Sequence, residues 1–346
     1  MVSERGLDVL KVIVQDYVAS REPVGSKSIV ERHSFGVSAA TIRNDMALLE
    51  EEELIVAPHT SSGRVPTDKG YRLFVDQLAD LRPLTGAQRQ AIEAFLGQSV
   101  DLDDVLARTV RLLSQLTQQV ALVQYPSLSR SRVRHIELVP LSSSRLMTVF
   151  ITDSGRVEQR ILEVAVAIDV EFLGELRGRL NAALGGRGLA EAATMLAQLH
   201  QQFPPTQQPM VRLVATSLIE QVAANRQDKL VMAGTANLVR TEDDFSGSIF
   251  PVLEAIEEQV TLLKLFSEMA VDQTGAPLSH GVSVSIGREN AEFGLGETSV
   301  LTSGYGASGG SLARLGVLGP IRMDYSNNMA AVRAVARYLT RLRGEE

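Results

Sequence analysis

Residues 38–72 read SAATIRNDMALLEEEELIVAPHTSSGRVPTDKGYR, and this stretch decides the fold of the N-terminal part of the chain. Its first half predicts a helix from Ser38 to about residue 54, because serine is a favoured N-cap residue. Three apolar residues of that helix recur at the spacing of one buried face: Ile42, Met46 and Leu49. The small and polar residues at its N-terminal end are therefore directed toward solvent.

The second half of the stretch predicts a short β-hairpin. Residues 55–57 and 64–65 flank turn residues 59–63, and a glycine stands near the tip. Pro58 and Pro66 limit the hairpin to an edge ribbon, because proline has no amide proton to donate within a central strand.

Further helices are expected on both sides of this unit. Residues 4–19 place their apolar side chains on one face of a helix, and Ser26 is a suitable N-cap for a short helix to about Arg32. Downstream, Thr67 is expected to cap a fourth helix, which a linker rich in turn residues follows. We therefore expect a first domain over residues 1–82.

Beyond this domain, helix and strand patterns alternate. Helical segments are expected at 87–97, 101–117, 170–228, 249–270 and about 327–343, and glycines at 185–188 and prolines at 204–205 break the segment 170–228. Strand segments are expected between 119 and 163 and again at 282–286 and 315–318. Strands on both sides of a helical block indicate an insertion. The predicted fold class is α+β and multidomain, with a unit over 87–346 that is interrupted at about 165–245. The strands at about 133–163 fit either this unit or the insertion.

Composition and missing motifs exclude several classes of protein. The 346-residue chain has no cysteine, which excludes a disulfide framework, a thiolate zinc site and a thiol nucleophile. It shows no signal-peptide pattern and no apolar run of the ~18 residues that a membrane helix needs, so we expect a cytoplasmic protein without a membrane partner. The five histidines are scattered, and the glycine-rich stretch 304–310 lacks the ending of a phosphate loop and is predicted to be a loop. We expect no enzyme, no metal site and no cofactor.

The net charge of −7 means that DNA binding would need a local basic face. The order helix, helix, turn, helix, ribbon over residues 4–66 is typical of a winged helix-turn-helix, in which the third helix enters the major groove. The acidic run 50–53 lies at the far end of that helix, where it can point away from DNA. A three-helix cluster with a hairpin can also mediate protein contacts, and the pattern leaves both interpretations open.

On the DNA interpretation, two sets of residues are candidates. The set that reads or approaches bases lies at the start of the third helix: Ser38, Ala39, Thr41, Arg43 and Asn44. The set that positions the DNA backbone comprises Lys27, Thr60, Ser61 and Arg64. A single module buries only about 600–1,000 Å² of protein surface, so we expect a homodimer that reads two half-sites. The helical block 170–228 is a candidate for holding that dimer together.

Five stretches of the chain carry a resemblance to a known family. They are EPVGS (22–26), SAATIRNDM (38–46), PHTSSGRVPTDKGYR (58–72), IGREN (286–290) and GVLGPIRMDY (316–325). On these stretches, and over nearly its full length, the chain resembles the HrcA family of heat-inducible transcription repressors. The stretch 58–72 is long and highly specific.

This resemblance implies both an architecture and a function. It implies a winged-helix head, a GAF-like α+β domain and an inserted dimerisation domain. It also implies repression of chaperone operons through an inverted repeat of double-stranded DNA called CIRCE. The chaperonin is implied as a further partner that keeps the repressor active, so that heat relieves repression when unfolded protein occupies the chaperonin.

Two other classes of function stay open at this point. In a small-molecule sensor, the GAF-like domain would control the same head, and a ligand would shift the melting temperature. An interaction module would form a dimer that ignores every DNA duplex.

Overall fold

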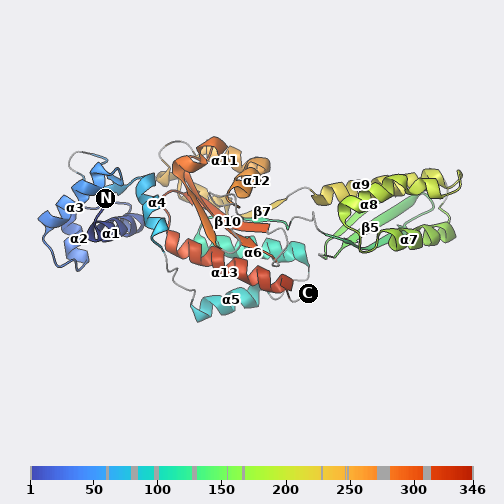
Figure 1. Cartoon of the computed structure of the whole chain (residues 1–346), viewed down its shortest axis with the longest axis horizontal. Coiled ribbons are helices and arrows are strands. Elements are labelled where there is room, and N and C mark those ends of the chain that lie inside the picture. Colours follow the sequence, from blue (N-terminus) through green and yellow to red (C-terminus); the bar gives the residue numbers. More distant parts are fainter. Residues whose placement is uncertain are drawn as a thin grey trace.

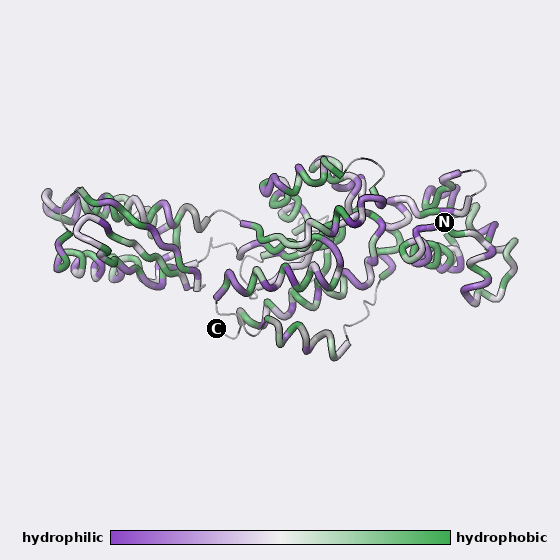
Figure 2. Tube along the Cα trace, turned by 180° about the vertical axis from the view of Figure 1, so that it is seen from behind, coloured by the Kyte–Doolittle hydropathy of each residue, from purple (hydrophilic) through white to green (hydrophobic). Residues whose placement is uncertain are grey.

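The computed structural model describes residues 2–59, 62–78, 85–96, 101–126, 131–153, 155–165, 168–226, 229–245, 247, 249–270, 281–306 and 313–344. Three parts follow one another along its longest axis (Figure 1). We call them the head (residues 2–78), the sheet domain (85–126 and 229–344) and the lobe (131–226). Hydrophobic and hydrophilic residues alternate along the helices of all three parts (Figure 2), as expected for helices that cover a core with one face.

The head consists of four helices and a two-stranded ribbon. Its elements are α1 (Glu4–Ser20), α2 (Ser26–Arg32), α3 (Ala39–Glu51), β1 (Ile55–Val56), β2 (Val65–Pro66) and α4 (Asp68–Asp76). The predicted caps Ser38 and Thr67 are confirmed, since their hydroxyl oxygens accept the amide protons of Thr41 and Gly70. Helix α3 ends a turn earlier than expected, because Glu53 has a left-handed φ of 59°. The cap of α2 is Gly25, so the prediction of Ser26 was wrong by one residue.

The sheet domain contains a five-stranded antiparallel sheet in the order β7-β3-β10-β9-β8. The strands are β3 (Val120–Gln124), β7 (Leu230–Ala233), β8 (Val282–Ile286), β9 (Thr298–Tyr305) and β10 (Ala313–Pro320). One face packs against α6 (Leu102–Thr117) and α13 (Tyr325–Gly344), with α5 (Gly86–Leu96) outside them (Figure 1). Helices α11 (Phe250–Glu257) and α12 (Gln259–Glu268) cover the other face, after α10 (Thr235–Arg240). Both faces are thus covered, and every residue of β9 and β10 is buried.

The lobe has its own sheet and its own hydrophobic core. Its strands β4 (Val133–Pro140), β5 (Arg145–Thr152) and β6 (Val157–Glu163) pair in that order. Three helices pack on one face: α7 (Val170–Leu184), α8 (Leu189–Leu199) and α9 (Gln208–Arg226). The lobe is inserted between β3 and β7, which are neighbours in the sheet of the sheet domain. The Tyr125 amide donates to Lys229 O at 2.8 Å, so the two ends of the insertion meet.

The structure corrects three expectations about these segments. The strands between 133 and 163 pack with the helices of the lobe, and residues 230–245 return to the sheet domain, so the insertion spans about 131–226 rather than 165–245. The predicted single helix over 249–270 is two helices, which meet at Glu258 with its non-helical ψ of 76°. Residues 304 and 305 of the predicted glycine-rich loop belong to β9, while 307–310 lie outside the described residues.

Candidate nucleic-acid interface

Helix α3 is fixed to the rest of the head by its apolar face and by an ion pair with α1. Ile42, Met46 and Leu49 are buried against α1 and α2, as the spacing predicted. Asp45 lies on the same helix with only 5% of its area exposed, and the Arg5 guanidinium of α1 donates to both its oxygens, at 2.8 and 3.1 Å. The helix is therefore presented as a rigid element.

The opposite face of α3 carries two polar side chains into solvent. Arg43 and Asn44 are both exposed, and Lys27 is exposed near the start of α2. Among the described residues, none of these three side chains has a hydrogen-bond or ion-pair partner. A cation and an amide at the start of a helix are the groups that read guanine and adenine edges in a major groove.

Ser38, Ala39 and Thr41 lie at the N-terminus of the same helix. The Ser38 hydroxyl accepts the Thr41 amide proton at 3.2 Å and lies 3.0 Å from the Thr41 hydroxyl. Both hydroxyls therefore serve the helix cap, and Ala39 beside them is half-buried. Positive partial charge of the helix dipole accumulates at this end, which favours a nearby phosphate.

The ribbon is held to the head at its base by Arg64. The Arg64 amide donates to Val24 O at 2.8 Å, and the Val24 amide donates to Arg64 O at 2.9 Å, so the loop before α2 forms an isolated antiparallel β-bridge with the residue that precedes β2. The Arg64 guanidinium donates to Glu50 at the end of α3 and to Ser62 O. Its predicted contact with a DNA backbone would have to compete with these bonds.

The two remaining candidates, Thr60 and Ser61, lie outside the described residues. On either side of them, the His59 amide donates to the Ser62 hydroxyl at 3.0 Å, and that hydroxyl donates to His59 O at 2.7 Å. These bonds hold His59 and Ser62 close together.

The acidic run 50–53 lies at the C-terminal end of α3. This helix has 13 residues, so the run is separated from the capped end by about 20 Å at 1.5 Å per residue. Glu50 is paired with Arg64, and the carbonyl oxygens of Glu52 and Glu53 accept hydrogen bonds from Lys69 and Thr67. The run therefore begins about 9 Å along the helix axis from Asn44, and the charge of Glu50 at its start is paired with Arg64.

The sheet domain holds a buried cation. Arg314 on β10 is 3% exposed, and its guanidinium donates to the hydroxyls of Thr302 and Ser283 at 2.6 and 3.0 Å. Burial lowers the pKa of Arg314 to about 10. Within the described part of the chain, no group of three or more His, Asp or Glu side chains could hold a metal ion, and no helix is both long and apolar enough to cross a membrane.

Sequence reasoning missed the residues that hold the recognition elements in place. The Arg5–Asp45 pair joins positions 40 residues apart, and the Val24–Arg64 pairing has the same separation. One signal was available for the second pair, because EPVGS and the ribbon both belong to the stretches that carry the family resemblance.

These observations define the class of the protein. It is a mixed α/β protein of several parts, in which a small helical head presents the polar start of one helix to solvent.

Comparison with known proteins identifies the family. A family model described as "HrcA protein C terminal domain" matches residues 103–329. The chain is 74% identical over 342 residues to the "Heat-inducible transcription repressor HrcA" of Clavibacter michiganensis subsp. michiganensis, covering 99% of both chains. It is 68% identical to the protein of the same name from Leifsonia xyli subsp. xyli, covering 100% of both. The chain belongs to the HrcA family.

One solved structure shares the whole fold. A crystal structure described as that of a hypothetical protein aligns with a TM-score of 0.70 and 23% identity, covering 100% of this chain and 99% of the other. The order of head, sheet domain and lobe therefore has a counterpart among experimental structures.

Proposed function

We propose that this protein is a DNA-binding repressor of heat-shock chaperone genes that acts as a homodimer on an inverted-repeat operator of the CIRCE type. In this proposal the head is a winged helix-turn-helix, the sheet domain is GAF-like and the lobe is the inserted dimerisation domain. It is not an enzyme. The names of the relatives, which describe heat-inducible transcription repressors, support this function.

The observation that carries the proposal is the exposed start of α3. Arg43 and Asn44 stand in solvent on a helix that a buried face and the Arg5–Asp45 pair hold rigidly. A preorganised helix loses little conformational entropy when it enters a groove, so its contacts count almost fully toward affinity. Thr60 and Ser61, together with Lys27, are proposed to bind phosphates beside it.

The proposed dimer uses the open face of the lobe sheet. Residues of β5 alternate, so Leu146, Thr148 and Phe150 are buried toward the helices and their neighbours face away from them. Val157 and Ile161 on β6 are 57% and 60% exposed, and they pair with Ile151 and Met147 on β5.

A contiguous apolar face of this kind is expected to be covered by a partner. A second copy of the chain is the occupant that a two-fold operator requires, because two heads must bind two half-sites. The lobe lies at the opposite end of the molecule from the head (Figure 1), so a lobe-to-lobe dimer leaves both heads accessible.

The proposed role of the chaperonin rests on the family resemblance. Adding purified chaperonin to a DNA-binding assay tests it directly, since a chaperonin that keeps the repressor active would increase the fraction competent to bind.

The proposal is tested with the purified chain and two duplexes, one carrying the CIRCE inverted repeat and one a scrambled repeat, over a series of salt concentrations. We expect tight, salt-sensitive preference for the repeat, because phosphate contacts release counterions and base contacts distinguish the sequences. Equal weak binding to both duplexes would reject the proposal and favour a ligand sensor or an interaction module.

Two variants assign the roles of the candidates. Asn44→Ala is expected to weaken binding to the repeat by about 1–3 kcal/mol and to relax the choice of base at one position. If Arg43 binds a phosphate, Arg43→Ala weakens binding to all duplexes alike and makes the salt dependence shallower. Arg240→Ala, which removes an exposed arginine from α10, is the matched control and should change neither property.

A further inference from the structure

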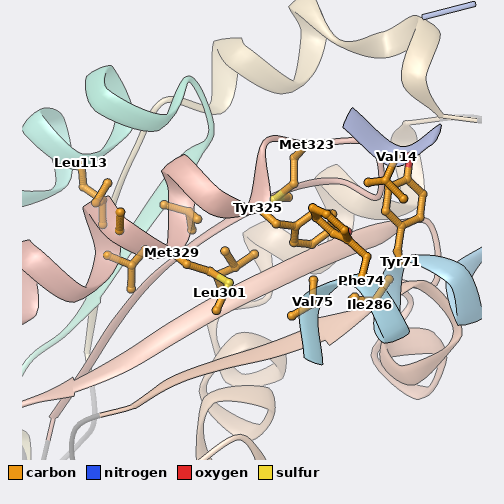
Figure 3. Packing of buried hydrophobic residues seen from close by; sticks show 14 of the residues in the cluster. Val14, Tyr71, Phe74, Val75, Leu113, Ile286, Leu301, Met323, Tyr325 and Met329 are labelled. Atoms are coloured by element: carbon orange, nitrogen blue, oxygen red, sulfur yellow. The ribbon is translucent and has the colours of Figure 1, made fainter. Parts of the chain in front are cut away.

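The head and the sheet domain share one hydrophobic core. A single apolar cluster runs from α1 and α4 of the head into β8, β9 and α13 of the sheet domain. Figure 3 shows Val14, Tyr71 and Phe74 from the head side by side with Ile286 and Tyr325 from the sheet domain. The rings of Tyr71 and Tyr325 lie 5.6 Å apart between centroids. The junction is therefore packed like a domain interior.

A first set of polar contacts joins α4 to the strand β8. The Arg72 guanidinium donates to Val284 O at 2.7 Å and to Glu289 Oε1 at 2.9 Å, and it also pairs with Glu289 Oε2. Glu289 in turn accepts the Ile286 amide proton at 2.8 Å. A planar guanidinium bound to both oxygens of a carboxylate fixes direction as well as distance.

The start of α4 is held at the same place. Asp68 Oδ2 accepts the backbone amide proton of Arg288 at 3.1 Å. Gly287 precedes it with a left-handed φ of 52°, and a Cβ there would lie 2.2 Å from Asp68 Oδ2. The contact therefore depends on glycine at this position.

A second set of contacts holds the C-terminal end of α1. Asp244, whose side chain is 4% exposed, accepts hydrogen bonds of 2.7 and 2.6 Å from Arg322 and one of 3.1 Å from Arg21. Arg322 also donates to Val18 O at 2.6 Å, where a cation favours the negative end of the helix dipole. Asp244 thus ties residues of the head and of the sheet domain into one network.

From these contacts we infer that Arg72, Asp244 and Arg322 are positioning residues that lock the head in one orientation on the sheet domain and thereby fix the spacing of operator half-sites. This inference rests on the proposed function. Two separate polar attachments leave only rotation about the line between them, and the apolar cluster between α4 and the sheet domain blocks that rotation. In a dimer joined through its lobes, the separation of the two recognition helices then depends on this junction.

The inference predicts a specific defect when the attachments are removed. The test lengthens the spacer of the inverted repeat by about five base pairs, which is half a helical turn. A dimer with locked heads can then bind with only one head, so its affinity should fall by about 100-fold or more. Arg72→Gln combined with Asp244→Asn removes charge from both attachments and leaves the apolar cluster in place. Its heads can adjust, so the same change of spacer should cost less than about tenfold.

A second measurement follows head orientation without DNA. The chain has no cysteine, so Lys11→Cys on α1 and Lys264→Cys on α12, both exposed, give two unique sites for spin labels. Pulsed electron paramagnetic resonance on labelled chains diluted with unlabelled chains should give one narrow distance distribution, which broadens when Arg72→Gln and Asp244→Asn are added. Arg187→Gln removes an exposed ion pair with Glu191 in the lobe and is the matched control.

The outcomes separate this inference from the function on which it rests. A narrow distribution that does not broaden, with unchanged spacing selectivity in the variant, would overturn the inference even if the repeat is bound tightly. If the original protein fails to bind the repeat, the proposed function is rejected. A distance distribution that broadens in the double variant would still support the inference that these contacts fix the orientation of the head. If the double variant melts below the assay temperature, Arg72→Gln and Arg21→Gln are tested singly, since Arg21 is the half-exposed member of the Asp244 network.

Discussion

Replacing Gly63 with alanine is expected to detach the ribbon from the loop before α2. A Cβ atom at Gly63 would lie 2.5 Å from Pro23 O and 2.6 Å from the carbonyl carbon of Val24. These are backbone atoms that cannot rotate away, so the two segments must move apart. The Val24 and Arg64 hydrogen bonds of 2.9 and 2.8 Å then break.

The size of the effect follows from the two hydrogen bonds that break and from the steric overlap that the new methyl group creates. Two backbone hydrogen bonds are worth about 1 kcal/mol each, and forcing a methyl group into a packed site costs about 1–3 kcal/mol if the segments stay together. The local opening free energy should therefore fall by about 2–3 kcal/mol. At 1.4 kcal/mol per factor of ten, the amides of Val24 and Arg64 should exchange about 30- to 150-fold faster.

Hydrogen exchange followed by mass spectrometry on peptides covering residues 20–32 and 62–70 measures this change. Gly25→Ala is the control, because a Cβ there meets nothing closer than Ser28 Oγ at 3.9 Å. Gly25→Ala should change the exchange rates by no more than about fivefold, because it removes only a glycine N-cap. Unchanged exchange at Val24 and Arg64 in the Gly63→Ala variant would refute the reasoning that the close approach requires glycine.

Three further predictions concern the other parts of the molecule. Gly70→Ala places a Cβ 2.0 Å from Leu54 O, so calorimetry should show the head less stable by about 1–3 kcal/mol. Ile161→Lys puts a charge on the open face of the lobe sheet, and sedimentation should then find monomers at concentrations where the original chain is dimeric. Burial and a hydrogen bond to Asp103 raise the pKa of Tyr125 to about 12. The unfolded chain releases this proton near pH 10, so the free energy of unfolding should fall between about pH 10 and 12, and less steeply in Tyr125→Phe.

Each of these predictions has a matched comparison. Gly86→Ala is the control for Gly70→Ala, because a Cβ at Gly86 has no atom within 4 Å. Equal destabilisation by the two substitutions would contradict the steric account. Val239 on α10 is 58% exposed outside the lobe, so a dimer lost equally in Val239→Lys would argue against the lobe face. Identical pH dependence of unfolding with and without the Tyr125 hydroxyl would remove that group as the cause.

Local features of this fold could be predicted from the sequence. The caps at Ser38 and Thr67 involve a hydroxyl and an amide three residues away, so nothing outside the segment decides them. The breaks of the lobe helices at 185–188 and 204–205 are likewise set by glycine and proline within the segment. Short-range chemistry determines where these helices begin and end.

Partners of strands could not be predicted in the same way. The sequence pattern of an antiparallel strand indicates which of its faces is buried, but it does not indicate which element covers that face. The strands between 133 and 163 therefore fitted either unit, and only their packing against α7 and α9 assigns them to the lobe. Strand β9 escaped notice because its buried positions include Thr298, Ser299, Thr302 and Ser303, which weaken the apolar pattern.

The candidate interface shows the same division between local and distant information. Arg43 and Asn44 were found from helix periodicity alone, since the buried residues of α3 determine which side chains remain exposed. Arg64 was expected to reach DNA as a single surface arginine. Its pairing with Glu50, 14 residues earlier, depends on how the ribbon folds back onto α3, which no local pattern encodes.

The two C-terminal stretches that carry the family resemblance, 286–290 and 316–325, contribute contacts to the junction with the head. Glu289 of IGREN binds Arg72, and Arg322 of GVLGPIRMDY binds Asp244 and Val18 O, so residues more than 200 positions from the head determine how it is held. At the other end of the sheet domain, the Arg156 guanidinium of the lobe lies 5.4 Å from the centre of the Tyr125 ring. A cation over an aromatic ring constrains direction less than a buried bidentate ion pair does. The head therefore has the more strongly directed of these two attachments, and each head should move together with its sheet domain as one body.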